Sequence, residues 1–170
     1  MNRTKAVART LTLLRHAKSS WKDQDLPDIE RPLSKRGRRD AEAMAPRIVA
    51  KGGSFGTVYA SPARRSRDTL TRMLQALPAQ DSRIVLDHRL YTFGRDALIG
   101  TLKQLDDSLL DVLVIGHNPA LQDGIGWLTG EPLARFPTAA CARLTLQLPH
   151  WSELHKGSAA LDWLLTPRGP

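Results

Sequence analysis

The chain has 170 residues, 41% of them hydrophobic, which suits one domain with a proper core, and no apolar stretch approaches the roughly 20 residues of a membrane span. The single cysteine, Cys141, excludes an internal disulfide, and no secretory signal follows the N-terminal residues, so we expect one cytoplasmic domain over 1–170 with flexible ends at 1–9 and 166–170. The net charge of +8 favours anionic partners or indicates a merely basic surface, whereas 5% aromatic content argues against a stacking platform for single-stranded nucleic acid.

Apolar strand-like runs alternate with helical stretches along the chain, a pattern typical of an α/β domain. The expected elements, in chain order, are strand Thr10–Leu14, helix Ser34–Ala50, strand Thr57–Ala60, helix Ala63–Ala76, strand Ile84–Leu86, helix Arg95–Leu105, strand Val112–Ile115, helix Ala120–Leu128, strand Arg143–Leu148 and a possible last strand Ala160–Leu165. Ser34 is a plausible N-cap of the first helix.

Polar side chains follow three of these strands, at the point where each strand ends. Arg15 and His16 come after the first strand, Arg64 and Arg65 soon after the second, and His117 after the fourth. In an open, mostly parallel sheet, ligands bind outside the carboxyl ends of the strands. We therefore expect both histidines and at least one further arginine to converge on one pocket.

The residue types in this pocket favour chemistry on phosphate. Arginine is always charged and its guanidinium forks onto phosphate oxygens, while imidazole is a nucleophile or acid–base group near neutral pH. Side by side at a strand end, Arg15 and His16 suggest phosphoryl transfer through a histidine.

Four blocks carry a resemblance to a known family: Leu13–Trp21 (LLRHAKSSW), Arg31–Gly37 (RPLSKRG), Val58–Thr69 (VYASPARRSRDT) and Val114–Pro119 (VIGHNP). In order and spacing they resemble the histidine phosphatase superfamily, and within it the short SixA-type phosphohistidine phosphatases. The resemblance covers most of the chain. It implies a phosphoglycerate-mutase-like α/β fold: a three-layer α/β/α sandwich with a mostly parallel sheet and one antiparallel strand.

The resemblance also implies roles for individual residues. His16 would be the nucleophile that becomes phosphorylated, with Arg15 as a phosphate clamp beside it. The family block Ser-x-x-x-Arg-x-x-x-Thr falls on Ser61, Arg65 and Thr69, which makes Arg65, rather than Arg64, the second clamp.

Further residues take their expected roles from the same comparison of motifs. His117 matches the second core histidine, which we expect to be protonated, and Ser19 lies where the loop after the nucleophile often touches phosphate oxygens. Each could instead be structural: His117 a satisfied histidine before a turn, Ser19 a loop residue. For Arg31 and Arg36 we favour local packing and helix-start electrostatics over catalysis.

One position departs from the family pattern. In many relatives a glutamate shortly after the third strand protonates an alkoxide leaving group, but the register Leu90-Tyr91-Thr92 puts a threonine there. Asp96 and Asp87 are the candidates to replace this acid, although such a residue is more often a helix cap or a surface charge. The missing acid favours P–N cleavage, since an imidazole leaving group depends less on protonation by an acid than an alkoxide does.

The sequence as a whole therefore predicts a metal-independent phosphatase that needs no cofactor and acts on phosphohistidine in a protein. One alternative is a small-molecule phosphomonoesterase on the same scaffold. Others, from a different class, are a non-catalytic module that binds phosphohistidine and one that binds nucleic acid. A cysteine phosphatase is excluded. Its loop needs an arginine six positions after the cysteine, and the residue six positions after Cys141 is Gln147.

Overall fold

The computed structural model describes residues 4–169 and contains one six-stranded sheet. The elements are β1 (Val7–Arg15), η1 (Asp28–Glu30), α1 (Lys35–Ala50), β2 (Thr57–Ala60), α2 (Arg64–Gln75), β3 (Arg83–Leu86), η2 (His88–Leu90), α3 (Arg95–Leu102), β4 (Asp111–Gly116), α4 (Ala120–Thr129), β5 (Cys141–Leu148), η3 (Trp151–Glu153) and β6 (Ala159–Leu165), where η marks a 3₁₀ helix. All ten expected helices and strands are present, with β1 longer and α3 shorter than expected.

The strand order is β3-β2-β4-β1-β5-β6. Strands β3, β2, β4 and β1 pair in parallel. Strand β5 runs antiparallel to both of its neighbours, so β6 points the same way as β1. Within the described sheet β5 is therefore the one antiparallel strand, and the expected topology is confirmed.

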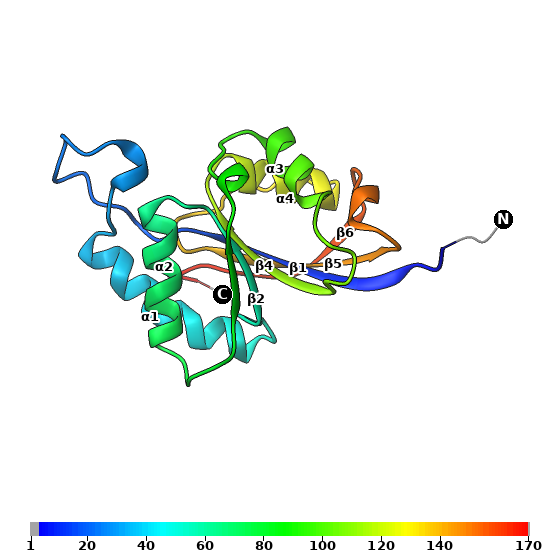
Figure 1. The fold of residues 1–170 in the computed structure, drawn as a ribbon, viewed down its shortest axis with the longest axis horizontal. Coiled ribbons are helices and arrows are strands. Elements are labelled where there is room, and N and C mark those ends of the chain that lie inside the picture. Colours follow the sequence, from blue (N-terminus) through cyan, green and yellow to red (C-terminus); the bar gives the residue numbers. More distant parts are fainter. Residues whose placement is uncertain (1–3, 170) are drawn as a thin grey trace.

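Helices cover both faces of the sheet and complete a three-layer α/β/α sandwich. Helices α1 and α2 lie on one face, and α3 and α4 lie on the other (Figure 1). Each face has its own buried cluster. Leu11 and Leu13 of β1 pack into the cluster under α3 and α4, whereas Leu14 packs into the cluster under α1 and α2. A parallel strand at the centre of such a sheet is buried on both sides, which explains why β1 reads as a continuous apolar run.

The ends of the chain are more ordered than we expected. Arg9 is 2% exposed, lies in β1, and donates through its guanidinium to the carbonyl of Leu148. Near the other end, Arg47 of α1 donates to the carbonyls of Thr166 and Gly169. The expectation of flexible ends at 1–9 and 166–170 is therefore wrong for Val7–Arg9 and for 166–169, because polar side chains hold the backbone there. Residues 1–3 and 170 lie outside the described part.

The loop after β1 is fixed against the start of α1. The Ser34 hydroxyl caps this helix by accepting from the backbone N–H of Gly37, as expected. A Cβ atom on Gly37 would lie 2.1 Å from the carbonyl oxygen of Lys18, so a larger residue would push the loop away. None of the helices within residues 4–169 has the length and hydropathy to cross a membrane.

Candidate active site

Two histidines meet at the carboxyl edge of the sheet. His16 follows β1 and His117 follows β4, and the parallel register pairs Arg15 with Gly116, the residues directly before them. The two imidazole rings consequently lie with their centroids 5.1 Å apart. His16 is 7% exposed and His117 is 1% exposed, so both rings are largely shielded from solvent.

Helix α2 brings an arginine to the same place. Arg65 lies in its first turn and is 2% exposed. Thr69, one turn later, donates through its hydroxyl to the carbonyl of Arg65 and accepts from the backbone N–H of Ala17 at 2.9 Å. Thr69 thus links the loop after His16 to α2. These two hydrogen bonds explain physically why a threonine follows Arg65 at a spacing of four residues.

The hydrogen bond of His16 selects which ring nitrogen is free to react. Its Nδ1 lies 2.7 Å from the carbonyl oxygen of Ala17. A carbonyl can only accept, so Nδ1 carries the proton and the lone pair is on Nε2. Burial, together with the charges of Arg65 and Arg15, lowers the pKa of His16 to about 3. His16 is therefore neutral at physiological pH, with a nucleophilic nitrogen available.

His117 is held by a serine from the neighbouring strand end. Its Nε2 lies 2.7 Å from the Ser61 hydroxyl oxygen, while its buried Nδ1 has no hydrogen-bond partner. Burial is the main cause that lowers the pKa of His117 to about 3, and His16 and Arg65 add to the effect. In the protein without a bound anion, desolvation and nearby positive groups therefore keep this ring neutral. The expected protonation of His117 concerns the phosphoryl-transfer step and stays a prediction.

Three buried nitrogens in this cluster have no hydrogen-bond partner: Nε of Arg15, Nε of Arg65 and Nδ1 of His117. Leaving a buried donor unpaired is costly, and such groups are rare in folded proteins. The Arg15 guanidinium is fixed from its other end, where Nη1 donates to the carbonyl of Phe136 at 3.1 Å. The site therefore offers at least two fixed arginine N–H groups to an anion that lies beside His16.

A carboxylate that was not predicted from the sequence lies in this site. Asp28 of η1 accepts from Arg65 Nη2 at 2.9 Å and from Arg31 Nε at 3.1 Å, and Tyr91 donates its hydroxyl to the same carboxylate. Burial alone would raise the pKa of Asp28, but the hydrogen bonds from Tyr91 and Arg65 outweigh it and the pKa falls to about 2. Asp28 is therefore ionised and fixes the orientation of the Arg65 guanidinium.

Ser19 lies in the loop after His16, as its sequence position requires, but its hydroxyl already has a hydrogen-bond partner. Arg31 Nη1 donates to Ser19 Oγ at 2.6 Å, and Arg31 also pairs with Asp28. Arg31 is thus a buried structural link between this loop and η1, in line with the packing role that we favoured. Arg36 pairs with Asp40 of the same helix and makes no contact with the two histidines.

The two carboxylates that were candidates to replace the acid form ion pairs with other residues. Asp87 caps η2 and pairs with Arg89, whose hydrogen bond is the main cause that lowers the Asp87 pKa. The Asp96 side chain is 90% exposed and pairs with its neighbour Arg95. Neither carboxylate contacts the histidines, so the suggestion that one of them replaces the acid at Thr92 is not supported by the geometry.

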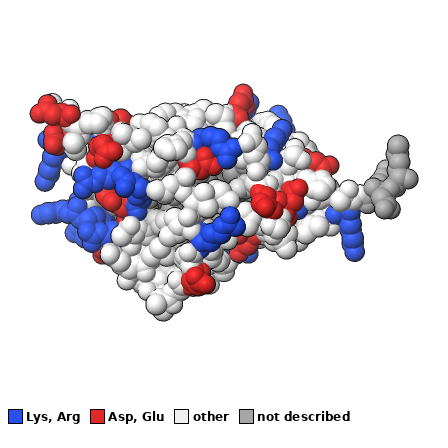
Figure 2. Space-filling model, in the orientation of Figure 1, with Lys and Arg blue, Asp and Glu red and all other residues white. Residues whose placement is uncertain are grey.

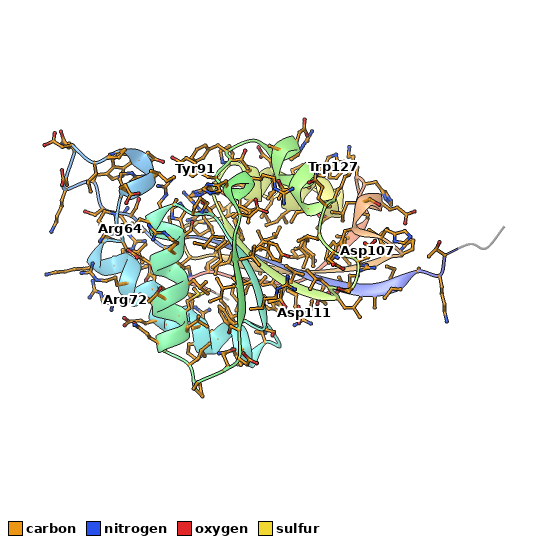
Figure 3. The ribbon with its side chains drawn as sticks, viewed as in Figure 1. Arg64, Arg72, Tyr91, Asp107, Asp111 and Trp127 are labelled. Carbon is orange, nitrogen blue, oxygen red and sulfur yellow. The ribbon has the colours of Figure 1, made fainter. Side chains whose placement is uncertain are left out.

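Two aromatic rings flank the position of Thr92 and contact the second histidine. The ring centroids of Tyr91 and Phe93 lie 5.4 and 5.3 Å from that of His117. Tyr91 directly follows η2 and is labelled in the upper part of the view in Figure 3. One indirect signal of this wall was present in the sequence, because the register that placed Thr92 near the site places its two neighbours there as well.

Positive charge surrounds this end of the molecule. In Figure 2, Lys and Arg atoms gather at the left of the view, over the beginnings of α1 and α2. Arg64 and Arg72, labelled in Figure 3, belong to this surface. A field of this sign attracts anions toward the histidine pair. As for metal ligands, no group of three or more His, Cys, Asp or Glu side chains is arranged to hold an ion within residues 4–169.

The depressed histidine pKa values lead to a testable expectation. The ring resonances of His16 and His117, followed by NMR, should show no titration between pH 8 and pH 5, because both groups have a pKa of about 3 in the folded protein. Unfolding restores a pKa near 6.5, so the unfolded chain binds more protons and the free energy of unfolding should decrease as the pH falls from about 7 toward 3. A titration midpoint near 6.5 for either ring would contradict this electrostatic description.

Comparison with protein families and curated proteins shows which proteins this chain is similar to. The model of the histidine phosphatase superfamily (branch 1) matches residues 11–94, which include His16, Arg15 and Arg65. An uncharacterized protein of Mycobacterium tuberculosis is 31% identical over 165 residues, which cover 91% of this chain and 100% of that protein.

Solved structures share the fold over nearly the whole chain. A protein from Nakamurella multipartita, described as a candidate phosphohistidine phosphatase SixA, superposes with a TM-score of 0.80 at 25% identity and covers 97% of this chain and 99% of its own. The protein histidine phosphatase SixA in complex with tungstate superposes with a TM-score of 0.77 at 24% identity, over 93% of this chain and 97% of its own.

Proposed function

The chain belongs to the histidine phosphatase superfamily as a SixA-type phosphatase, and from this premise we propose that it hydrolyses phosphohistidine in proteins through a phosphorylated His16, without a metal ion. The observation that carries the proposal is the set of unpaired buried nitrogens on Arg15, Arg65 and His117 beside the neutral His16 ring. A tetrahedral dianion next to His16 satisfies these donors.

In the first step, the lone pair on Nε2 of His16 attacks phosphorus. The bond from phosphorus to the substrate ring nitrogen breaks, and its electron pair stays on that nitrogen. Arg15 and Arg65 neutralise the charge on the phosphoryl oxygens. In the His117 tautomer whose Nε2 accepts from the Ser61 hydroxyl, Nδ1–H donates to one of these oxygens. Nδ1 of His16 keeps its proton and its hydrogen bond to Ala17, which stabilises the positive charge that the ring acquires.

In the second step, water attacks the phosphoryl group on His16. The P–N bond breaks, its electron pair returns to Nε2, and both protons of the water leave with inorganic phosphate. The same three donors serve this step, because the phosphoryl oxygens stay between them. In this scheme catalysis consists of positioning and electrostatic stabilisation, which requires no metal ion.

The substrate preference rests on the absence of an acid from the leaving-group side. Thr92 takes the position of the usual acid, while Asp87 and Asp96 are paired elsewhere and Asp28 is ionised. An alkoxide from serine or a sugar is a poor leaving group unless it is protonated, whereas an imidazole leaves readily. In a transfer from phosphohistidine to His16, nucleophile and leaving group are the same chemical group.

The decisive measurement is a comparison of kcat/KM among substrates that differ in the leaving group. We expect the wild-type protein to hydrolyse a phosphohistidine peptide with a higher kcat/KM than a phosphoserine peptide of the same sequence or a sugar phosphate. A ratio below one would move the assignment to a small-molecule or general phosphatase. Phosphohistidine binding without turnover would instead identify a binding module.

A second expectation concerns metals and oxyanions. EDTA should leave the activity unchanged, and vanadate should inhibit competitively because it can occupy the space between Arg15 and Arg65 as a phosphoryl group would. The tungstate complex of the SixA relative is consistent with such a site. Loss of activity in EDTA that returns with a divalent cation would contradict the metal-free mechanism.

A further inference from the structure

An aromatic wall leads from the buried histidine pair to solvent. Phe93 is 45% exposed, and its ring lies 5.3 Å from the His117 ring and 5.5 Å from the Tyr91 ring. His117 itself is 1% exposed, so the wall begins at the buried end of the site and ends at the surface. Exposure of a large ring costs free energy, and neither core cluster includes Phe93.

A carboxylate lies at the polar edge of this wall. The Tyr91 hydroxyl donates to Asp28, and the Arg65 guanidinium carbon lies 6.0 Å from the Tyr91 ring centroid. The Asp28 side chain is 43% exposed, and its carboxylate is ionised. Because Asp28 also accepts from Arg65, the wall lies next to the donors that hold the phosphoryl group.

We propose that Tyr91 and Phe93, with Asp28 at their edge, form the subsite for the leaving group and bind the imidazolium ring of a substrate phosphohistidine. This inference rests on the proposed function and names the part of the site that recognises the substrate side chain. A flat cation binds favourably to aromatic faces, and a nearby carboxylate adds to the attraction. A serine or sugar leaving group presents no such ring.

The subsite also explains how P–N cleavage proceeds without an acid at position 92. A phosphohistidine ring that carries a proton on its other nitrogen is a cation. When the P–N bond breaks, the electron pair stays on the nitrogen that held phosphorus, and the ring leaves as neutral imidazole. The phosphoryl group moves to Nε2 of His16. The proton that the missing acid would supply is already on the substrate, and the subsite favours this protonated form.

The test compares two P–N substrates, of which only one releases an imidazole ring. Phosphohistidine peptide releases imidazole, whereas phosphoramidate releases ammonia and has no ring to bind. In Phe93→Ala, kcat/KM for the phosphohistidine peptide should fall about 10-fold more than kcat/KM for phosphoramidate, mainly through KM. Phe93→Leu, which keeps apolar volume but removes the aromatic face, should behave like Phe93→Ala, whereas Phe93→Trp should stay close to the wild type.

Leu161 supplies a matched control, because it is 42% exposed and lies on β6, away from the carboxyl edge of β1. Leu161→Ala should leave kcat/KM unchanged for both substrates. An equal loss for both substrates in Phe93→Ala, or full recovery in Phe93→Leu, would overturn the subsite. These outcomes differ from failure of the proposed function, which would appear in the wild-type protein as a preference for phosphoserine or sugar phosphates over phosphohistidine.

Discussion

Replacement of His16 by alanine should abolish phosphatase activity, with a loss in kcat on the order of 10³-fold or more, as expected when the group that forms the covalent intermediate is removed. The physical reason is the lone pair on Nε2, which is free to react because Nδ1 donates its proton to the Ala17 carbonyl. The measurement is kcat for phosphohistidine peptide in the wild type and in His16→Ala, with trapping of the acid-labile phosphoenzyme.

The His16→Ala protein should remain folded, because the side chain makes one hydrogen bond and the backbone bonds of this loop do not depend on the ring. Its thermal unfolding midpoint therefore serves as the control. Activity near the wild-type value in a folded His16→Ala protein would exclude His16 as the nucleophile. A phosphoenzyme that still forms in this variant would point to another residue as the acceptor.

The fold could be predicted because its determinants are local. Apolar runs of strand length alternate with capped helical stretches, and parallel strands buried on both faces leave a clear signal in the sequence. The errors of the sequence-based prediction lie at the boundaries of the elements. Strand β1 extends to Val7–Arg9 because the guanidinium group of Arg9, although charged, donates hydrogen bonds to backbone carbonyls at the end of β5. From composition alone, a basic segment at the end of a chain is predicted to be exposed to solvent.

The histidine pair and Arg65 could be predicted because strand ends converge at one edge of a parallel sheet. Asp28 could not, since it lies in the short 3₁₀ helix η1 and contacts Arg65, 37 residues away in sequence, at a spacing that corresponds to no motif. The same holds for the charge of His117. Whether a histidine is protonated depends on burial and on neighbouring charges, and these depend on packing that the sequence does not display.

The site combines strong positive charge with neutral histidines. Burial, which removes the water that would stabilise a charged imidazole, is the main cause that lowers the pKa of both rings, and the charges of Arg65 and Arg15 add to it. A neutral imidazole is thereby kept beside fixed cations. Asp28 neutralises part of the positive charge without contact to His16, so Arg65 stays oriented while its Nε remains free of a partner.

Replacement of Arg65 by alanine should cost on the order of 10²-fold or more in kcat/KM, because a preorganised donor to the phosphoryl oxygens is lost. Arg65→Lys should recover only part of the loss, since an ammonium group cannot bond Asp28 with two nitrogens and also present Nε–H to the substrate. The adjacent Arg64 is the matched control: its side chain is 46% exposed and pairs with Asp68. Arg64→Ala should therefore be much milder.

Loss of Arg65 also leaves Asp28 without one of its partners, so stability must be separated from catalysis. Asp28→Asn keeps the shape of the network but removes the carboxylate charge, and it should loosen Arg65 without deleting it. We expect its kcat/KM to lie between those of the wild type and Arg65→Ala, with an unfolding midpoint close to that of the wild type. If Arg64→Ala proves to be the damaging substitution while Arg65→Ala is tolerated, the second phosphate clamp has been assigned to the wrong residue of the pair.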